Sequence, residues 1–282
     1  MANSREIKNR IKSVKNTGKI TKTMAMVSTA KATKVVGIIK SSRPYADRLN
    51  QILQTLGGSE DVHPLLQKNT ETNKKLVIAI TANRGLCGGY NANIVKIAKE
   101  QADVNTDVIM FGKKGIGALK FANIDMIGQR THLKDMPLFE DAKELADEVM
   151  ELYERGEYSE VSIVYTKYIS AGSQKATLEK IFPFELDIDE EAEASQAGVE
   201  PLFIPNKDSL LSGLIPKVVR IAFYQYIMDA AASEHLARQM AMNSAADNAK
   251  DMVKALTLSY NRARQAQITT EIAEIVGGAE AL

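Results

Sequence analysis

Cysteine and histidine are scarce in this chain of 282 residues, which has one cysteine, Cys87, and three scattered histidines. A single cysteine excludes an internal disulfide and fits a reducing compartment. The metal and nucleophile motifs His-Glu-x-x-His, clustered cysteines and Gly-x-Ser-x-Gly do not occur. The sequence therefore offers no pattern typical of an active site, and the favoured role of Cys87 is a small packed thiol.

Long hydrophobic runs are also missing. No stretch approaches 18 consecutive apolar residues, so no membrane-spanning helix is predicted. The N-terminus has no apolar signal region, and although it is basic and acid-poor like a transit peptide, it reads as structural helix. We therefore expect a mature or bacterial chain that is not secreted.

Charge of one sign does not dominate, since the net charge is +1, but it is unevenly spread. Residues 1–50 carry eight Lys and four Arg against one Glu and one Asp, and residues 185–200 carry seven acids and no base. Tyr45 is the only aromatic residue among the first 50, and a reader of single-stranded nucleic acid would need stacking platforms. Nucleic acid is therefore not an expected partner, and 187–200 is predicted to be an acidic loop.

Glycine and proline are absent from residues 217–276. If helical throughout, these sixty residues would extend roughly 90 Å at 1.5 Å per residue, and such a helix needs a partner along its length. A stripe of apolar and small residues begins just before this run and continues along it. The spacing of the stripe averages nearer an eleven-residue repeat than a heptad, which predicts weak or locally reversed supercoiling. The stripe consists of Ile215, Val219, Ala222, Tyr226, Ala230, Ser233, Ala237, Met240 and Ser244.

The first segment, residues 4–56, is predicted to be the partner helix. Its apolar positions begin at Ile7, Ile11 and Val14 and then shift to Ile20, Met24 and Val27, and on to Val35 and Ile38. At 100° per residue this shift moves the apolar stripe around the helix, so we expect its parts to face different neighbours.

The middle of the chain alternates short apolar runs with helical patterns, which favours an α/β domain with a mainly parallel sheet. The last predicted strand is expected to run antiparallel at an edge. Strands are predicted at 76–80, 107–111, 124–127, 161–168 and 175–182, and helices at 91–101, 114–121 and 139–155.

We therefore expect an α/β fold in which the N- and C-terminal helices form a long antiparallel two-helix coiled coil with an inserted Rossmann-like α/β domain. The predicted domains are an N-terminal coiled-coil helix (1–57), a central α/β domain (74–205) and a C-terminal coiled-coil helix (209–282).

The turn from Gly85 to Tyr90 lies between a strand and a helix, where phosphate-binding loops occur. It lacks the Gly-Lys-Ser/Thr ending of a P-loop and the glycine spacing of a dinucleotide fingerprint. A tight structural turn is favoured over a nucleotide site, and no cofactor or metal is expected.

Three stretches together resemble the gamma subunit of F-type ATP synthase, of bacterial type. They are the C-terminal run from Ile268 to Ala281, the start from Ile7 to Lys31, and the turn from Arg84 to Asn91. One departure is Asn83, where the family usually has Asp, which puts any role for a charge there in doubt. The redox-regulatory cysteine insert of the chloroplast members is absent.

The resemblance implies a rotor shaft that is not itself an enzyme. It would turn inside three alpha and three beta subunits, bind the epsilon subunit and the membrane c-ring, and couple proton flow to ATP synthesis and hydrolysis, with a part in regulating ATPase activity. It also implies a peripheral protein at the cytoplasmic face of the bacterial inner membrane.

The resemblance further implies contact residues. Met24 matches a residue near the acidic loop of a catalytic subunit, and Lys22 and Lys31 would add complementary charge. Beyond about Ile272 the helix would lie in the hydrophobic sleeve of the head. A polar group that catches the loops of the head would comprise Arg264, Gln265, Thr269 and Glu271.

Two alternatives remain open at this point. One is a coiled-coil scaffold or adaptor without a rotary role, which a complex with one copy per alpha–beta head would exclude. The other is a nucleotide-binding enzyme that uses the turn at residues 85–89.

Overall fold

The computed structural model describes residues 4–56, 63–184 and 206–280, and its chain forms two compact units. The terminal unit comprises residues 1–28 and 238–282, and the sheet unit comprises residues 29–237. Helix α1 (Ser4–Leu56) and helix α6 (Lys207–Glu280) contribute to both units. Each unit therefore contains one stretch from either end of the chain. The acidic stretch 187–200 lies outside the described residues.

The sheet unit is built on five strands in the order β3-β2-β1-β4-β5. Strands β1 (Lys75–Ile80), β2 (Thr106–Phe111), β3 (Gly128–Arg130) and β4 (Glu160–Ser170) are parallel. Strand β5 (Ser173–Phe182) pairs antiparallel with β4 at the edge, which confirms the predicted edge strand.

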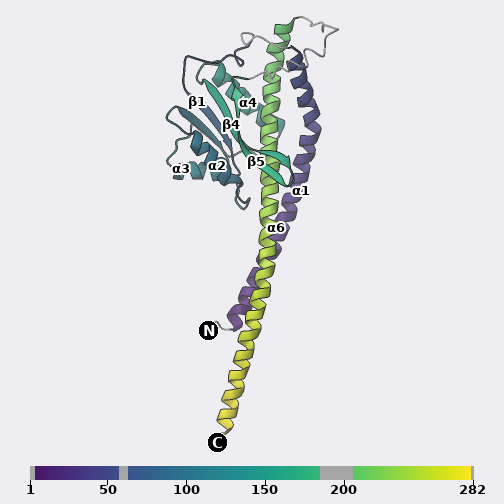
Figure 1. The fold of residues 1–282 in the computed structure, drawn as a ribbon, viewed down its shortest axis with the longest axis vertical. Helices are drawn as coiled ribbons and strands as arrows, with labels where there is room; N and C mark the ends of the chain where they lie inside the picture. Colours follow the sequence, from purple (N-terminus) through teal and green to yellow (C-terminus); the bar gives the residue numbers. More distant parts are fainter. Residues whose placement is uncertain (1–3, 57–62, 185–205, 281–282) are drawn as a thin grey trace. The chain divides into compact units, whose positions relative to one another are not determined.

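The strand residues alternate between two cores because successive side chains point to opposite faces of a sheet. Leu76, Ile78 and Ile80 face a core shared with α4 (Phe139–Glu154), α6 and the end of α1. Val77 and Ala79 face a second core shared with α2 (Tyr90–Gln101) and α3 (Lys113–Phe121). Figure 1 shows these helices on the two faces. The strands are thus buried on both sides, as in doubly wound α/β folds.

The third strand lies later than predicted. Residues 124–127 are not a strand, because Asn123 adopts a positive φ of 54° and the Ile124 N–H bonds the Leu119 carbonyl to close α3. Ile124 and Met126 pack against the core beneath this turn. These two residues are therefore apolar because the turn packs on the core, not because they form a strand. The short strand β3 follows at Gly128–Arg130.

In the terminal unit, α1 and α6 run antiparallel. The Ser4 hydroxyl bonds Gln267 Oε1 at 2.9 Å, and a Cβ built on Gly18 would lie 3.1 Å from the Ala249 Cβ. Half-buried and buried positions on both helices follow alternating steps of three and four. We call these positions the seam: Ile7, Ile11, Val14, Gly18, Thr21, Ala25 and Ser28 on α1, with Met242, Ala246, Ala249, Val253, Leu256, Tyr260 and Ala263 on α6.

The seam corrects the predicted apolar stripe of α1. Its alternating steps of three and four are a heptad, which favours left-handed supercoiling, whereas the eleven-residue spacing was predicted over 215–244, before most of the seam on α6. Ile20 is 61% exposed, and Val27 and Met240 are also exposed, so the predicted shift of the α1 stripe is wrong. Small and polar residues occupy the seam between Val14 and Ser28, and apolar periodicity alone overlooks them.

The predicted stripe on α6, from Ile215 to Ser244, matches the buried side of the helix at its start but not at its end, and the reason differs from that for α1. Ile215, Val219 and Ser233 are buried as predicted. In the sheet unit α6 has two buried sides, because Met228 and Ala232 also pack on Val35 and Ile39 of α1. The predicted stripe assumed one buried side of α6, whereas the helix has two in the sheet unit. In the terminal unit, the last predicted position, Ser244, is exposed.

Candidate functional site

A basic groove runs beside the seam in the terminal unit. Its floor is made of small and apolar seam residues, including Gly18 and Ala249. Its rim carries Lys15, Lys19 and Lys22 from α1 with Lys250 and Lys254 from α6, and Asp247 is its one carboxylate. Lys254 also bonds Asp251 on its own helix at 3.0 Å. Five lysines around an apolar floor make a surface suited to an acidic segment with some apolar side chains.

Of the two residues predicted near an acidic loop of a catalytic subunit, Lys22 lines this groove and Met24 does not. Lys22 is exposed at its rim, and Met24 is half-buried two positions further along α1. A flexible thioether at such a position can fill an irregular gap against a partner. The structure thus leaves Met24 and Lys22 available for contact.

The polar group predicted at the far end of α6 is also on the surface. Arg264, Gln265, Thr269 and Glu271 are exposed. The Thr269 hydroxyl bonds the Gln265 carbonyl at 2.9 Å, and Glu271 accepts a bond from Gln267 Nε2 at 3.0 Å. These bonds stay within one helix, so the group keeps capacity for a partner.

The end of α6 also exposes large apolar side chains. Helix α1 begins at Ser4, which bonds Gln267, so no residue of the described part of α1 lies beside α6 further on. The exposed apolar residues recur at steps of three and four along one side of the helix, the spacing of a stripe that packs on a partner. We call Ile268, Ile272, Ile275 and Val276 the end stripe.

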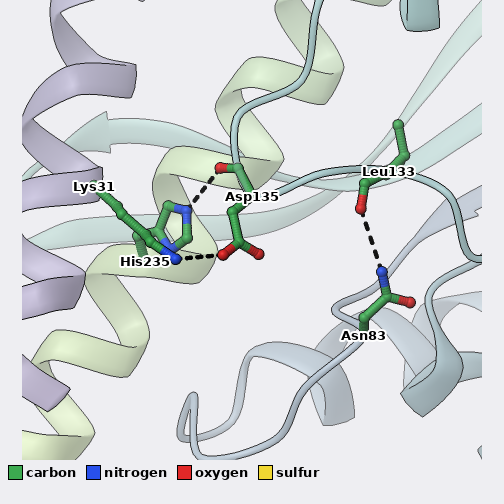
Figure 2. A network of polar contacts seen from close by, with 5 residues as sticks. All are labelled: Lys31, Asn83, Leu133, Asp135 and His235. Carbon is green, nitrogen blue, oxygen red and sulfur yellow. Dashed lines mark hydrogen bonds and ion pairs between the residues drawn. The ribbon is translucent and has the colours of Figure 1, made fainter.

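Lys31, the other lysine predicted to add charge near Met24, lies in the sheet unit and has a partner within the chain. Its ammonium pairs with the carboxylate of Asp135, on the loop between β3 and α4. The His235 Nε2 of α6 lies 2.9 Å from the Asp135 carbonyl oxygen, so that nitrogen donates. Figure 2 shows the two helices meeting at Asp135. Hydrogen bonding to Lys31 lowers the pKa of Asp135 below its ordinary value.

Asn83 holds the same loop from the sheet side. Its amide nitrogen donates to the carbonyls of Thr131 at 3.1 Å and Leu133 at 3.3 Å, the latter drawn in Figure 2. Its amide oxygen accepts the N–H of Lys113 at 3.1 Å. A carboxylate has no N–H to donate, so the departure from the family's usual Asp has a structural use here. Sequence reasoning noted Asn83 but missed Asp135 and His235, which lie far from it in the chain.

The turn after β1 is a packed turn. Cys87 is buried, which confirms the packed-thiol interpretation. The Asn91 side-chain oxygen accepts the Ala82 N–H at 2.8 Å, and the Tyr90 hydroxyl donates to the Ala230 carbonyl at 3.2 Å. Leu86 and Gly88 take positive φ values, 62° and 58°. The turn's polar groups thus serve to bind it to the strand end and to α6.

A cavity of about 520 Å³ lies in the sheet unit between α1, α6 and the β4–β5 hairpin. Asp229 of α6 lines it with only 8% of its surface exposed. Burial raises the pKa of Asp229 to about 6, against smaller opposing effects from the Tyr168 backbone, Arg43 and Lys167. Around the rim, three cations and three carboxylates balance, with Arg43, Lys167 and Lys180 against Asp47, Glu179 and Asp229.

No helix among the described residues is both long enough and apolar enough to cross a membrane.

Comparison with known proteins agrees with the fold. The family model described as ATP synthase matches residues 3–282. The ATP synthase gamma chain of Leptospira biflexa is 41% identical over 290 positions, and that of Desulfitobacterium hafniense is 40% identical over 289 positions, each comparison covering all of both chains.

Solved structures show the same fold. A chain of the Euglena gracilis mitochondrial ATP synthase OSCP/F1/c-ring structure, in rotational state 3, matches with a TM-score of 0.71 at 23% identity, covering 99% of this chain and 94% of that one. A chain of the rotor of the same complex, in rotational state 1, gives 0.68 at 23% identity, covering 94% and 98%. The full-length match to curated gamma chains does not favour the scaffold alternative, and the protein belongs to the ATP synthase gamma chain family.

Proposed function

We propose that this chain is the central rotor shaft of an F-type ATP synthase and makes no covalent bond itself. Rotation of a membrane c-ring by proton flow would turn the chain, and its faces would drive three catalytic sites through different affinities. The observation that carries the proposal is the antiparallel seam of α1 and α6, because twisting such a pair disrupts packing along its whole length. The names of full-length relatives at about 40% identity support it.

The proposed partners are three alpha and three beta subunits, the epsilon subunit and the c-ring. The titles of the matching solved structures name a rotor, F1 and a c-ring in other organisms. The basic groove, with Lys22 on its rim, suits acidic loops of the head, and Met24 is a proposed contact outside the groove. Arg264, Gln265, Thr269 and Glu271 are proposed to meet the head's loops, with the end stripe in an apolar sleeve. Lys31 is proposed to act chiefly within the chain.

The proposed domains are the coiled-coil arms 1–57 and 209–282 with the α/β domain 74–205 inserted between them. The five-stranded, mainly parallel sheet formed by β1 to β5 supports this division. The proposed location is the cytoplasmic face of the bacterial inner membrane, as a peripheral protein, and the bacterial sources of the relatives support it.

The experiment is co-expression of the chain with the alpha and beta subunits of its own source, followed by native mass measurement and single-molecule observation of a bead attached through a cysteine introduced at Val104, which is 98% exposed. We expect one copy of the chain per three alpha and three beta subunits and stepwise rotation of the bead when ATP is added. Several copies per head, or a 1:6 complex that hydrolyses ATP without turning the bead, would contradict the shaft and restore the scaffold.

A further inference from the structure

Asp135 is held by both long helices at once. Its side chain pairs with Lys31 of α1, and its carbonyl oxygen accepts a hydrogen bond from His235 of α6. Figure 2 shows both interactions at one residue. His235 is buried, and its second ring nitrogen, Nδ1, has no hydrogen-bond partner among the described residues. The one polar bond of this ring therefore goes to the loop.

The loop that carries Asp135 is tied at closely spaced points on either side. The Arg130 carbonyl accepts the Gly112 N–H at 2.9 Å, and Asn83 donates to the carbonyls of Thr131 and Leu133. At the other end, the Leu138 N–H bonds Asp141 at 3.0 Å in the first turn of α4. Asp135 is therefore presented to the helices by a loop that is itself bound to the sheet.

Apolar packing alone would leave the angle between helix and sheet weakly defined, because hydrophobic contact is non-directional. Hydrogen bonds and ion pairs fix direction as well as distance. The apolar contacts of α1 with the main core of the sheet unit are at Leu49, Leu53 and Leu56, and a smaller cluster joins Val35 and Ile39 to α6 and to Tyr168 of β4. Lys31 lies four positions before Val35, so the Asp135 contact adds a directional, polar attachment at the end of this apolar contact.

We propose that Lys31, Asp135 and His235, held in place by Asn83, form a clasp that fixes the sheet domain to both helices and passes torque between them. The four residues act by position and take no part in chemistry. The part of the proposal that concerns torque rests on the proposed rotor function, whereas the part that concerns attachment does not.

Attachment is tested by amide hydrogen exchange on the full chain. Asp135→Asn removes the charge that pairs with Lys31, and Asn83→Asp removes both donors to the loop while keeping an acceptor for Lys113. We expect either change to speed exchange of the hydrogen-bonded amides at the two ends of the loop, those of Gly112 and Leu138, about tenfold, the scale of losing one or two hydrogen bonds. The matched control is Glu100→Gln, which breaks the exposed Lys96–Glu100 pair on α2 and should leave the loop unchanged.

His235 offers a second matched pair of variants. His235→Gln keeps an N–H donor at similar reach, whereas His235→Ala removes it. We expect exchange in the loop to speed up for Ala and to stay near the wild-type rate for Gln. The double variant of Lys31→Gln with Asp135→Asn should exchange no faster than either single variant, because both remove the same pair. Wild-type exchange rates in all the single variants, or additive effects in the double variant, would overturn the clasp.

Torque is tested in the assembled complex in vesicles, by the ratio of ATP synthesis to ATP hydrolysis. We expect Asp135→Asn to lower this ratio while the complex still hydrolyses ATP and keeps its melting temperature. A lower melting temperature with an unchanged ratio would show a purely structural role and overturn the torque claim. If the wild-type chain forms no rotating complex, the proposed rotor function is wrong. The hydrogen-exchange results would still show whether the clasp attaches the loop to the two helices.

Discussion

At the scale of single residues, the surroundings of a carboxyl group decide the direction of its pKa shift. Asp229 and Asp135 lie in the same unit, yet their surroundings shift the pKa in opposite directions. Burial raises the pKa of Asp229, and the hydrogen bond from Lys31 lowers that of Asp135. Neither shift follows from the sequence around the residue, because the causes lie on other elements.

Asp229→Asn is expected to stabilise the chain at neutral pH. The folded-state pKa of Asp229, about 6, exceeds the ordinary value of about 3.9, so its protonated form is favoured by folding. Its contribution to stability is full below about pH 4 and is lost as pH rises to about 6. The Asn variant should therefore be more stable by about 2 kcal/mol at pH 7.5 and nearly equal to wild type at pH 4.

The measurement is urea unfolding of the full chain at pH 4, 5, 6 and 7.5. Asp125→Asn is the matched control, because Asp125 is exposed, and its unfolding midpoint should follow wild type at every pH. Midpoints of Asp229→Asn that run parallel to wild type across this range would show that the carboxyl is charged in both folded and unfolded chains.

At the scale of elements, the pattern of the sequence predicted most helices and strands but not which side of each helix is covered. Strands β1, β2, β4 and β5 were predicted to within about two residues, because alternating burial and β-rich composition act locally. The seam was missed because Gly18, Ala25 and Ser28 give no apolar signal. Small residues become core only when a partner helix approaches closely, and that depends on the other end of the chain.

Contacts between distant parts of the chain also limit what could be predicted of the candidate site. Met24, Lys22 and the polar group near Thr269 were placed on α1 and α6 by family resemblance, and the structure shows them half-buried or exposed. The Lys31–Asp135 pair joins residues 104 positions apart. No local pattern could have indicated it.

Two glycines on α1 provide a test of the seam. Gly18 lies on the seam, where an added Cβ would come within 3.1 Å of the Ala249 Cβ, whereas Gly37 has open space around it. Alanine favours a helix interior over glycine by about 1 kcal/mol. We expect Gly37→Ala to stabilise the chain by about 0.5–1 kcal/mol and Gly18→Ala to give less or none of that gain, because the seam must move apart.

Thermal unfolding followed by circular dichroism, with both single variants and the double variant, measures this difference. Gly18→Leu extends the series, since a larger side chain should overpack the seam and destabilise it by about 1–3 kcal/mol. Equal stabilisation by Gly18→Ala and Gly37→Ala would mean that the two helices do not approach closely at Gly18.

At the scale of the whole molecule, the described surface is shaped for contact with other chains. The basic groove gathers five lysines and one carboxylate around an apolar floor, and the end stripe exposes large apolar side chains. Exposed apolar stripes of this spacing mark interaction sites. Stability of the isolated chain and stability of its complexes should therefore depend on different residues.

Replacing Ile268, Ile272 and Ile275 together by Gln tests this separation. Ile275 is 72% exposed and the other two are at least two-fifths exposed, so the isolated chain should melt within a degree or so of wild type, as surface changes usually alter stability by less than about 0.5 kcal/mol. In a complex that buries the stripe, each substitution should cost about 1.5–3 kcal/mol of binding free energy, or roughly tenfold or more in affinity.

Titration of labelled chain into alpha–beta heads measures the affinity. Val104→Gln, which replaces an apolar side chain that is 98% exposed in the sheet unit, is the control and should bind like wild type. If the triple variant binds as tightly as the control, the end stripe is not buried by the head, and its apolar character must serve another partner.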